Sequence, residues 1–224
     1  MNKVLKIKKY NSRAAVQLKS RTSEGRALEP YTPLEYFQKR VVDYTLVTLL
    51  GVVTLPVVLY TIYRIKKESP GPIIFKQSRT GLYGKTFTCY KFRSMHVDGH
   101  FNPYTEENDS RIFPFGVVMR KMRIDELPQL INILRGEMHM IGPRAEWNIL
   151  AEKYTKDIPH YNDRHLIRPG ITGLAQVMYP YGRSVEDARR KLKYDLLYIK
   201  NWSLMLELKV ILKTVTVILG QKGM

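Results

Sequence analysis

The longest stretch of apolar positions runs from Tyr44 to Tyr63 and contains no charged residue. As a helix rising 1.5 Å per residue, it is about as long as the hydrocarbon core of a bilayer is thick, roughly 30 Å. The stretch starts too far from Met1 for a signal sequence and lacks a small-residue cleavage site. Its length also exceeds what a core helix of a soluble protein needs. We therefore expect a helix embedded in a membrane.

Basic residues flank this stretch on both sides. Lys39 and Arg40 precede it, and Arg64, Lys66 and Lys67 follow it. A helix that crosses a membrane shows a Lys/Arg bias toward one side, so this pattern favours a helix that enters, bends and returns. Pro56 lies within the stretch, has no N–H for the carbonyl of Val52, and is expected to kink or break the helix. An ordinary spanning helix also tolerates proline and stays open as an alternative.

The remaining pattern predicts an α+β fold that is mainly helical. Two β-rich stretches, Ile73–Gln77 and Lys85–Phe92, are separated by glycines and predict a hairpin. Helices are predicted from near Asp125 to Gly136, over Glu146–Tyr154, over Val185–Tyr198 and over Ser203–Leu219. The last is amphipathic, with lysines in an apolar stretch, and suits a membrane interface or a packed surface equally well. We divide the chain into a basic tail (1–36), a re-entrant anchor (37–67) and a cytoplasmic domain (68–224), whose C-terminal helices are expected at the membrane interface.

The charge balance points to a polyanionic partner. The chain carries 37 Lys and Arg against 20 Asp and Glu, a formal net charge of +17. Nucleic acid, anionic lipid and phosphorylated substrates all fit such an excess, and the apolar stretch favours the last two. Cys89 is the one cysteine, so no intrachain disulfide can form, and a reducing cytoplasmic compartment fits. Zinc-type spacings, dinucleotide loops and P-loops are absent from the sequence.

An adjacent acidic pair, Asp125-Glu126, carries the most chemistry. Pro128 is tolerated only in the first turn of a helix, so the pair should lie at a helix start, where negative charge is stabilised. Arg120, Lys121 and Arg123 stand immediately before it. A carboxylate in this setting can attack a phosphoryl group or hold Mg²⁺ against one. The alternative is a simple helix cap, which is the usual role of such a pair.

Other basic residues are candidate phosphate contacts, but each is weak evidence when taken alone. Arg144 follows Gly142-Pro143, a rigid turn that would present a guanidinium. Lys91 lies near the end of the second predicted strand. His165 and Arg168 precede the Pro169–Gly173 turn and are candidate ligand contacts, with turn packing as the default interpretation.

The order of these candidate residues and their surrounding motifs along the chain is more informative than any one of them. From about Phe37 onward the sequence resembles the bacterial sugar transferases known as monotopic polyprenyl-phosphate phosphoglycosyltransferases. The segments that carry the resemblance are KRVVDYTLVTLLGVVTLPVVLY, GPIIFKQSRTG, YKFRSM, MRKMRIDELPQLINILRGEMHMIGPR, RHLIRPGITGLAQV and DLLYIKNWSLMLELKVILKT. Three differences from the family pattern stand out. Leu55-Pro56 replaces the usual Ser-Pro of the anchor, and Pro143-Arg144-Ala145 replaces a Pro-Arg-Pro turn. The segment 178–183 is longer than the usual pattern and is a candidate contact for the sugar or nucleotide.

The resemblance implies an enzyme that transfers a sugar phosphate from a UDP-sugar to undecaprenyl phosphate and thereby starts a capsule, exopolysaccharide, O-antigen or glycoprotein glycan. Asp125 would attack the sugar-bearing phosphate and release UMP, and the acceptor would then take the sugar phosphate from the aspartyl intermediate. Glu126 would assist, with Mg²⁺ as the cofactor held by Asp125 and Glu126. Lys91, Arg120 and Arg144 match family positions that contact phosphates.

The expected location is the bacterial inner membrane, with a re-entrant anchor and the active site on the cytoplasmic face. We expect no nucleic-acid partner and leave a homodimer open. The competing interpretation is a non-catalytic, membrane-tethered basic scaffold that binds anionic lipid or nucleic acid. It accounts for the charge and the anchor, but it gives no reason for the DELPQL and RPGITG segments.

Overall fold

The apolar stretch lies within one long helix, α2 (Pro33–Glu68), in the computed structural model of the chain, which describes residues 31–97, 109–179, 182 and 184–220. Thr32 and Glu35 form a reciprocal capping box at its start, with Pro33 in the first turn. The predicted tail therefore lies almost wholly outside the described residues.

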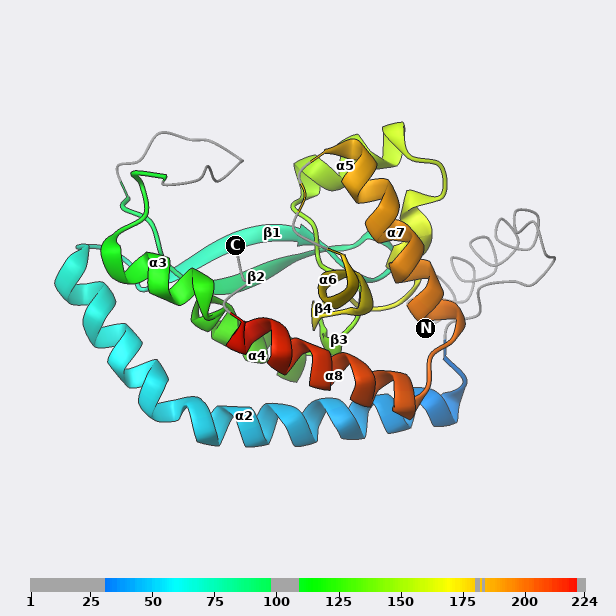
Figure 1. Cartoon of the computed structure of the whole chain (residues 1–224), viewed down its shortest axis with the longest axis horizontal. Helices are drawn as coiled ribbons and strands as arrows, with labels where there is room; N and C mark the ends of the chain where they lie inside the picture. Colours follow the sequence, from blue (N-terminus) through cyan, green and yellow to red (C-terminus); the bar gives the residue numbers. More distant parts are fainter. Residues whose placement is uncertain (1–30, 98–108, 180–181, 183, 221–224) are drawn as a thin grey trace, which may run out of the picture.

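α2 continues through Pro56, so the prediction of a break is wrong. The helix curves toward α3 in its second half (Figure 1), which agrees with the predicted kink. The hydroxyl of Thr54 donates to the carbonyl of Leu50 at 2.6 Å. Such a bond to the preceding turn bends helices, and here it comes just before the proline.

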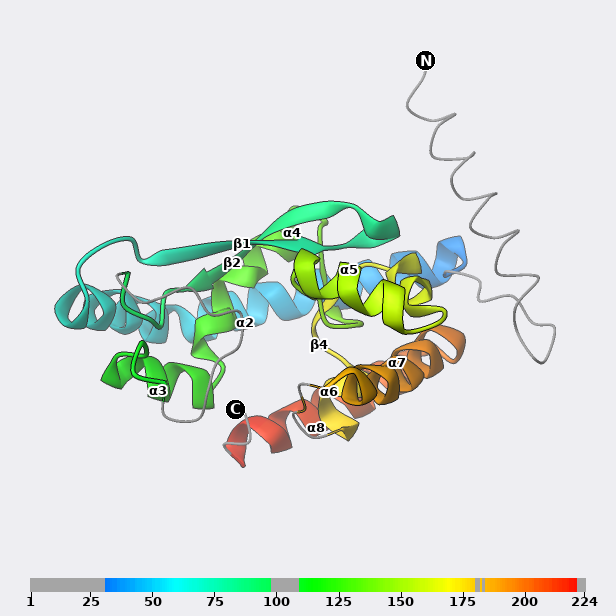
Figure 2. The same cartoon turned by 90° about the horizontal axis from the view of Figure 1, so that it is seen from above.

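A β-hairpin follows the helix, as predicted. β1 (Ile74–Thr80) pairs antiparallel with β2 (Thr86–Phe92), and the one-turn 3₁₀ helix η1 (Leu82–Gly84) joins them. Seen from above, the hairpin and the C-terminal helix α8 (Leu204–Leu219) lie on either side of α2 (Figure 2).

The remaining elements are short, apart from α7. In chain order they are α3 (Pro114–Lys121), η2 (Ile124–Gln129), α4 (Leu130–Leu134), β3 (His139–Ile141), α5 (Asn148–Asp157), η3 (Tyr161–Leu166), β4 (Gly170–Thr172), α6 (Leu174–Met178) and α7 (Val185–Lys200). The fold is thus mostly helical with small sheets, as the α+β prediction required. α7 and α8 match their predicted ranges closely.

Two boundaries differ from prediction for identifiable reasons. The helix expected from Asp125 begins as the 3₁₀ helix η2, and Arg123, not Asp125, occupies the cap position with a left-handed φ of 58°. α5 begins at Asn148 and not at Glu146, because the carbonyl of Glu146 accepts the amide of Thr80 and holds that residue beside β1.

The sequence analysis missed the parallel pair of β3 and β4, whose strands are three residues long. Glycines allow the pair to form. A Cβ on Gly170 would lie 2.1 Å from the amide nitrogen of Gly142, and one on Gly173 would lie 2.1 Å from the Gly142 carbonyl oxygen. The Gly-Pro-Arg turn and the RPGITG segment therefore lie side by side, and the amide of Gly170 donates to the carbonyl of Pro143.

The two halves of α2 pack against different core clusters of the same body. Val47 belongs to a cluster with Ile133, Met138, Ile141 and Tyr198, among others. Ile65 belongs to a second cluster that includes Phe92, Phe113 and Met119. Between these anchor points the helix stays exposed, and only 11% of its most apolar window is buried. A core helix would be mostly buried, so this segment has an apolar surface that the described residues do not cover.

A buried ion pair fixes the first half of α2 to α8. Lys39 Nζ lies 2.8 Å from Glu207 Oε2, and both side chains are almost completely shielded from solvent. The other Glu207 oxygen accepts hydrogen bonds from the hydroxyl of Tyr198 and, at 3.0 Å, from the indole of Trp202. Every polar atom of this carboxylate is thus engaged where water cannot replace a lost partner.

We expect Lys39→Met to lower the free energy of unfolding by about 3–5 kcal/mol, because it leaves the carboxylate of Glu207 buried and unpaired. Adding Glu207→Gln should restore most of the loss, since glutamine keeps the oxygen that accepts from Tyr198 and Trp202. The measurement is unfolding in detergent micelles, with Arg190→Met at an exposed ion pair as the control that leaves stability unchanged. A double variant no more stable than Lys39→Met would contradict this account.

Candidate active site

Three segments far apart in sequence bring charged side chains to one place. Lys91 comes from β2, Asp125 and Glu126 from η2, and Arg144 from the turn after β3. Glu126 Oε1 lies 3.0 Å from Lys91 Nζ, 2.8 Å from Arg144 Nη2 and 3.5 Å from Arg123 Nη1. Lys91 Nζ also lies 4.0 Å from Asp125 Oδ2. Four of the residues singled out from the sequence therefore share one site.

The conformation of η2 explains why the acidic pair is buried. The left-handed backbone at Arg123 ends the preceding turn, and a 3₁₀ helix packed against β2 then carries both carboxylates inward. Pro128 lies inside η2, two residues before α4 begins at Leu130. Asp125 and Glu126 are both buried as a result.

The two carboxylates have opposite electrostatic environments. The charges of Arg144, Lys91 and Arg123 outweigh burial at Glu126 and hold its pKa well below the ordinary value of 4.5. Burial raises the pKa of Asp125 above 3.8, and the neighbouring charge of Glu126 raises it further, against the opposing effect of Lys91. Asp125 Oδ1 is also buried without a hydrogen-bond partner. Such a carboxylate is poorly solvated, which favours a nucleophile or ligand over a structural ion pair.

The pair also offers a limited set of metal ligands. Among the described residues, no group of three or more His, Cys, Asp and Glu side chains is placed to hold a metal ion. Mg²⁺ in phosphoryl-transfer sites is commonly held by one or two carboxylates together with substrate phosphates and water. Asp125 Oδ1 and the carboxylate of Glu126 fit that mode.

The remaining candidate residues from the sequence are Arg120, His165 and Arg168. Arg120 donates to the hydroxyl of Ser94 at 2.9 Å, and its charge acts on Asp125. His165 is buried in η3, where burial and Arg164 lower its pKa to about 3, so it carries no charge at neutral pH. Arg168 donates to the carbonyl of Gly136 at 2.6 Å and lies over the ring of Tyr36. Neither His165 nor Arg168 forms an ion pair or hydrogen bond with the acidic pair in the described part of the chain.

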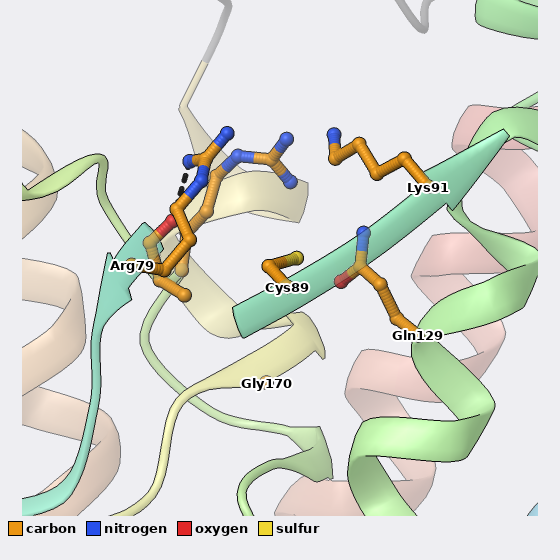
Figure 3. Close-up of a pocket in the computed structure, with 7 residues that line it drawn as sticks. Arg79, Cys89, Lys91, Gln129 and Gly170 are labelled. Atoms are coloured by element: carbon orange, nitrogen blue, oxygen red, sulfur yellow. Dashed lines mark hydrogen bonds between the residues drawn. The ribbon is translucent and has the colours of Figure 1, made fainter. Parts of the chain in front are cut away.

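The sequence analysis missed a cationic pocket beside the pair. It is lined by Arg79, Cys89, Lys91, Gln129, Arg144, Ala145 and Gly170 (Figure 3). The charged ends of Arg79 and Lys91 lie on the same side of β2, above the thiol of Cys89. Arg79 stands within the segment GPIIFKQSRTG, which carried the resemblance, but a lone arginine in a strand gave no separate signal.

A second missed residue, Arg164, supports the turn that presents Arg144. Its guanidinium donates to the carbonyl of Arg144 at 2.9 Å and pairs with Asp195 at 2.8 Å, deep in the protein. Arg79 holds the next carbonyl, that of Ala145, at 2.8 Å. Two arginines thus fix successive carbonyls of a turn in which alanine replaces the second proline of the family pattern.

Comparison with known proteins agrees with the family resemblance seen in the sequence. The profile of the family described as bacterial sugar transferase matches residues 34–221. A UDP-N-acetylgalactosamine-undecaprenyl-phosphate N-acetylgalactosaminephosphotransferase from Aeromonas hydrophila is 41% identical over 194 residues, 86% of this chain and 46% of that protein. A UDP-glucose:undecaprenyl-phosphate glucose-1-phosphate transferase from Caulobacter vibrioides is 42% identical over 182 residues, 80% of this chain and 68% of that protein. The chain spans half the length or less of several such relatives.

The opposed pKa directions predict opposite effects of two isosteric substitutions. Glu126→Gln should lower the free energy of unfolding at pH 7 by about 1–3 kcal/mol, because it removes a carboxylate paired with three cations. The folded pKa of Glu126 is depressed, so its stabilising contribution is full above about pH 4.5 and is lost as the pH falls through the folded value.

Asp125→Asn should leave the protein equally or more stable at pH 7, because folding disfavours the ionised form of a carboxyl whose pKa it raises. The free energy of unfolding of both variants and of the unchanged protein, measured at pH 7 and below pH 4.5, tests these two predictions. Equal destabilisation by both substitutions at pH 7 would refute the assigned environments.

Proposed function

The chain belongs to the bacterial sugar transferase family, and we propose that it transfers a sugar 1-phosphate from a UDP-sugar to undecaprenyl phosphate, releasing UMP and initiating a bacterial surface glycan. Relatives whose names state this reaction use UDP-glucose or UDP-N-acetylgalactosamine. The observation that carries the proposal is the buried Asp125–Glu126 pair surrounded by cations from three segments. A donor with two phosphates and an acceptor with one supply the negative charge that such a site lacks.

Asp125 is the proposed nucleophile. Its carboxylate attacks the phosphorus that bears the sugar, an Asp125–phosphorus bond forms, and the bond to the bridging oxygen breaks, so that UMP leaves with that oxygen. A phosphate oxygen of undecaprenyl phosphate then attacks the same phosphorus and frees the carboxylate. The support is the unpartnered, buried Oδ1, since an oxygen already held by hydrogen bonds is a weaker nucleophile.

Glu126 keeps the basic side chains in place. Its depressed pKa leaves it ionised, and it holds Lys91 and Arg144 at hydrogen-bond distance. We propose that Lys91, Arg144 and Arg120 bind the phosphate oxygens of donor and acceptor. Mg²⁺, held by Asp125 and Glu126, would screen the repulsion between the attacking carboxylate and the phosphate.

We further propose that α2 enters and leaves the cytoplasmic leaflet of the inner membrane on the same side. Its two halves pack against one body through Val47 and Ile65, whereas a straight span would separate its ends by the full thickness of the bilayer. α8 adds exposed apolar side chains to the proposed membrane face: Leu204, Met205, Leu208, Leu212, Val215 and Leu219. This location would place the site near the phosphate of a lipid acceptor. The homodimer that the sequence analysis left open is a separate question and stays a prediction.

The covalent step is tested by mixing purified protein, Mg²⁺ and UDP-glucose or UDP-N-acetylgalactosamine without acceptor. We expect release of UMP and a mass increase of one sugar phosphate on the peptide that contains Asp125. Asp125→Asn should reduce turnover by at least about a thousandfold. Asp157→Asn, the same change at an exposed position in α5, should not. Turnover without any adduct after rapid quenching would exclude the two-step route, and a scaffold would show no UMP release from either donor.

The topology is tested with cysteines at Ser23 and Lys67 in a Cys89→Ser background. Both sites should resist a membrane-impermeant maleimide in intact spheroplasts and should react after lysis, because both ends of α2 would lie in the cytoplasm. Labelling of one site alone in intact spheroplasts would instead establish an ordinary spanning helix.

A further inference from the structure

Arg79 differs from the other cations of the site in having no counter-ion. Lys91 and Arg144 share the carboxylate of Glu126. No ion pair is formed by Arg79 with any of the described residues, and the only hydrogen bond of its guanidinium there runs from Nη1 to the carbonyl of Ala145. Its Nε is shielded from solvent and has no partner. The guanidinium therefore keeps one unused donor, Nε, in a place where water does not satisfy it.

The surroundings of Arg79 also disfavour its positive charge. Burial lowers the pKa of Arg79, and the like charge of Arg144 lowers it further, against weaker opposing effects of Glu146, Cys89 and Glu126. Burial raises the pKa of the neighbouring Cys89 thiol, so that group supplies no negative charge. Two guanidinium groups and one ammonium group thus line one small pocket. A partly buried cation that lacks a counter-ion is stabilised when an anion completes the site.

The pocket lies next to the carboxylate pair and shares side chains with it. Lys91 and Arg144 line the pocket and contact Glu126, and Asp125 Oδ2 lies 4.0 Å from the ammonium group of Lys91. The two phosphates of a diphosphate are joined by one bridging oxygen. If one phosphate is within reach of Asp125, the other must lie beside it, and the pocket that Lys91 shares with Arg79 offers a guanidinium without a counter-ion.

We infer that Arg79 binds the leaving phosphate of the donor, the one that departs as part of the nucleoside monophosphate. This inference rests on the proposed function. As the bond between phosphorus and the bridging oxygen breaks, negative charge gathers on the departing phosphate. Arg79 and Arg144, which line the same pocket, can then donate charge-assisted hydrogen bonds to it. Lys91 stands between the two phosphate positions and serves both.

The test measures binding of inorganic pyrophosphate and of UMP to the full chain in detergent micelles by calorimetry. Arg79→Gln should weaken both affinities by about 10- to 100-fold, the loss of a charge-assisted contact. Lys76→Gln removes the same charge from an exposed position of β1 and should change them less than about twofold. Arg79→Lys, which keeps the charge, should retain part of the affinity. The KM for undecaprenyl phosphate should be unchanged in all three.

A double-variant cycle separates direct binding from a merely structural role. Arg79 also holds the carbonyl of Ala145, and a merely structural role would lower the affinity only through displacement of Arg144. In that case Arg79→Gln would have no effect on pyrophosphate binding in an Arg144→Gln background. We expect it to weaken binding there as well. No added effect in that background, or unchanged pyrophosphate affinity in Arg79→Gln alone, would overturn the inference.

Pyrophosphate binding requires no turnover, so this test and that of the proposed function can fail separately. Loss of pyrophosphate affinity in Arg79→Gln without UMP release from any UDP-sugar would refute the proposed function but not the anion pocket. Normal UMP release with undiminished UMP affinity in Arg79→Gln would refute the role of Arg79 alone.

Discussion

The site depends on one buried carboxylate, that of Glu126, which neutralises cations from three separate segments. Without it, Lys91 from β2, Arg144 from the turn after β3 and Arg123 before η2 would repel one another. Three cations on one acidic group leave an excess of positive charge, and that excess attracts phosphate. The same arrangement leaves Asp125 next to a like charge, buried and without a full set of partners. A stable ion-pair network and a reactive carboxylate thus arise from two adjacent residues.

The second constraint is the attachment of the apolar helix. Buried polar contacts hold its first half, where Lys39 pairs with Glu207 and the carboxylate of Asp43 contacts the ring of His139. Apolar packing around Ile65 holds its second half. The exposed middle is therefore fixed relative to the acidic pair. For a lipid-borne acceptor, such an arrangement sets the depth of the site in the membrane.

Local pattern predicted the hairpin, α7, α8 and the apolar helix, because each has a clear periodicity or punctuation. Asp125, Glu126, Lys91 and Arg144 could be proposed as one site only through resemblance, since they lie on three segments that no local rule brings together. β3 and β4 are too short to give a signal, and their pairing depends on the close approach of Gly142 and Gly170. Arg79 and Arg164 were missed because the contacts that bring them to the site are made to backbone carbonyls of a distant turn.

The central claim is that Asp125 holds the sugar phosphate between two half-reactions, and isotope exchange tests it most directly. Labelled UMP is incubated with the protein and an unlabelled UDP-sugar in the absence of undecaprenyl phosphate. The account predicts that label enters the UDP-sugar, because the aspartyl intermediate can return its sugar phosphate to UMP, and that Asp125→Asn abolishes this exchange. Exchange that requires the lipid acceptor, or that persists in Asp125→Asn, would contradict it.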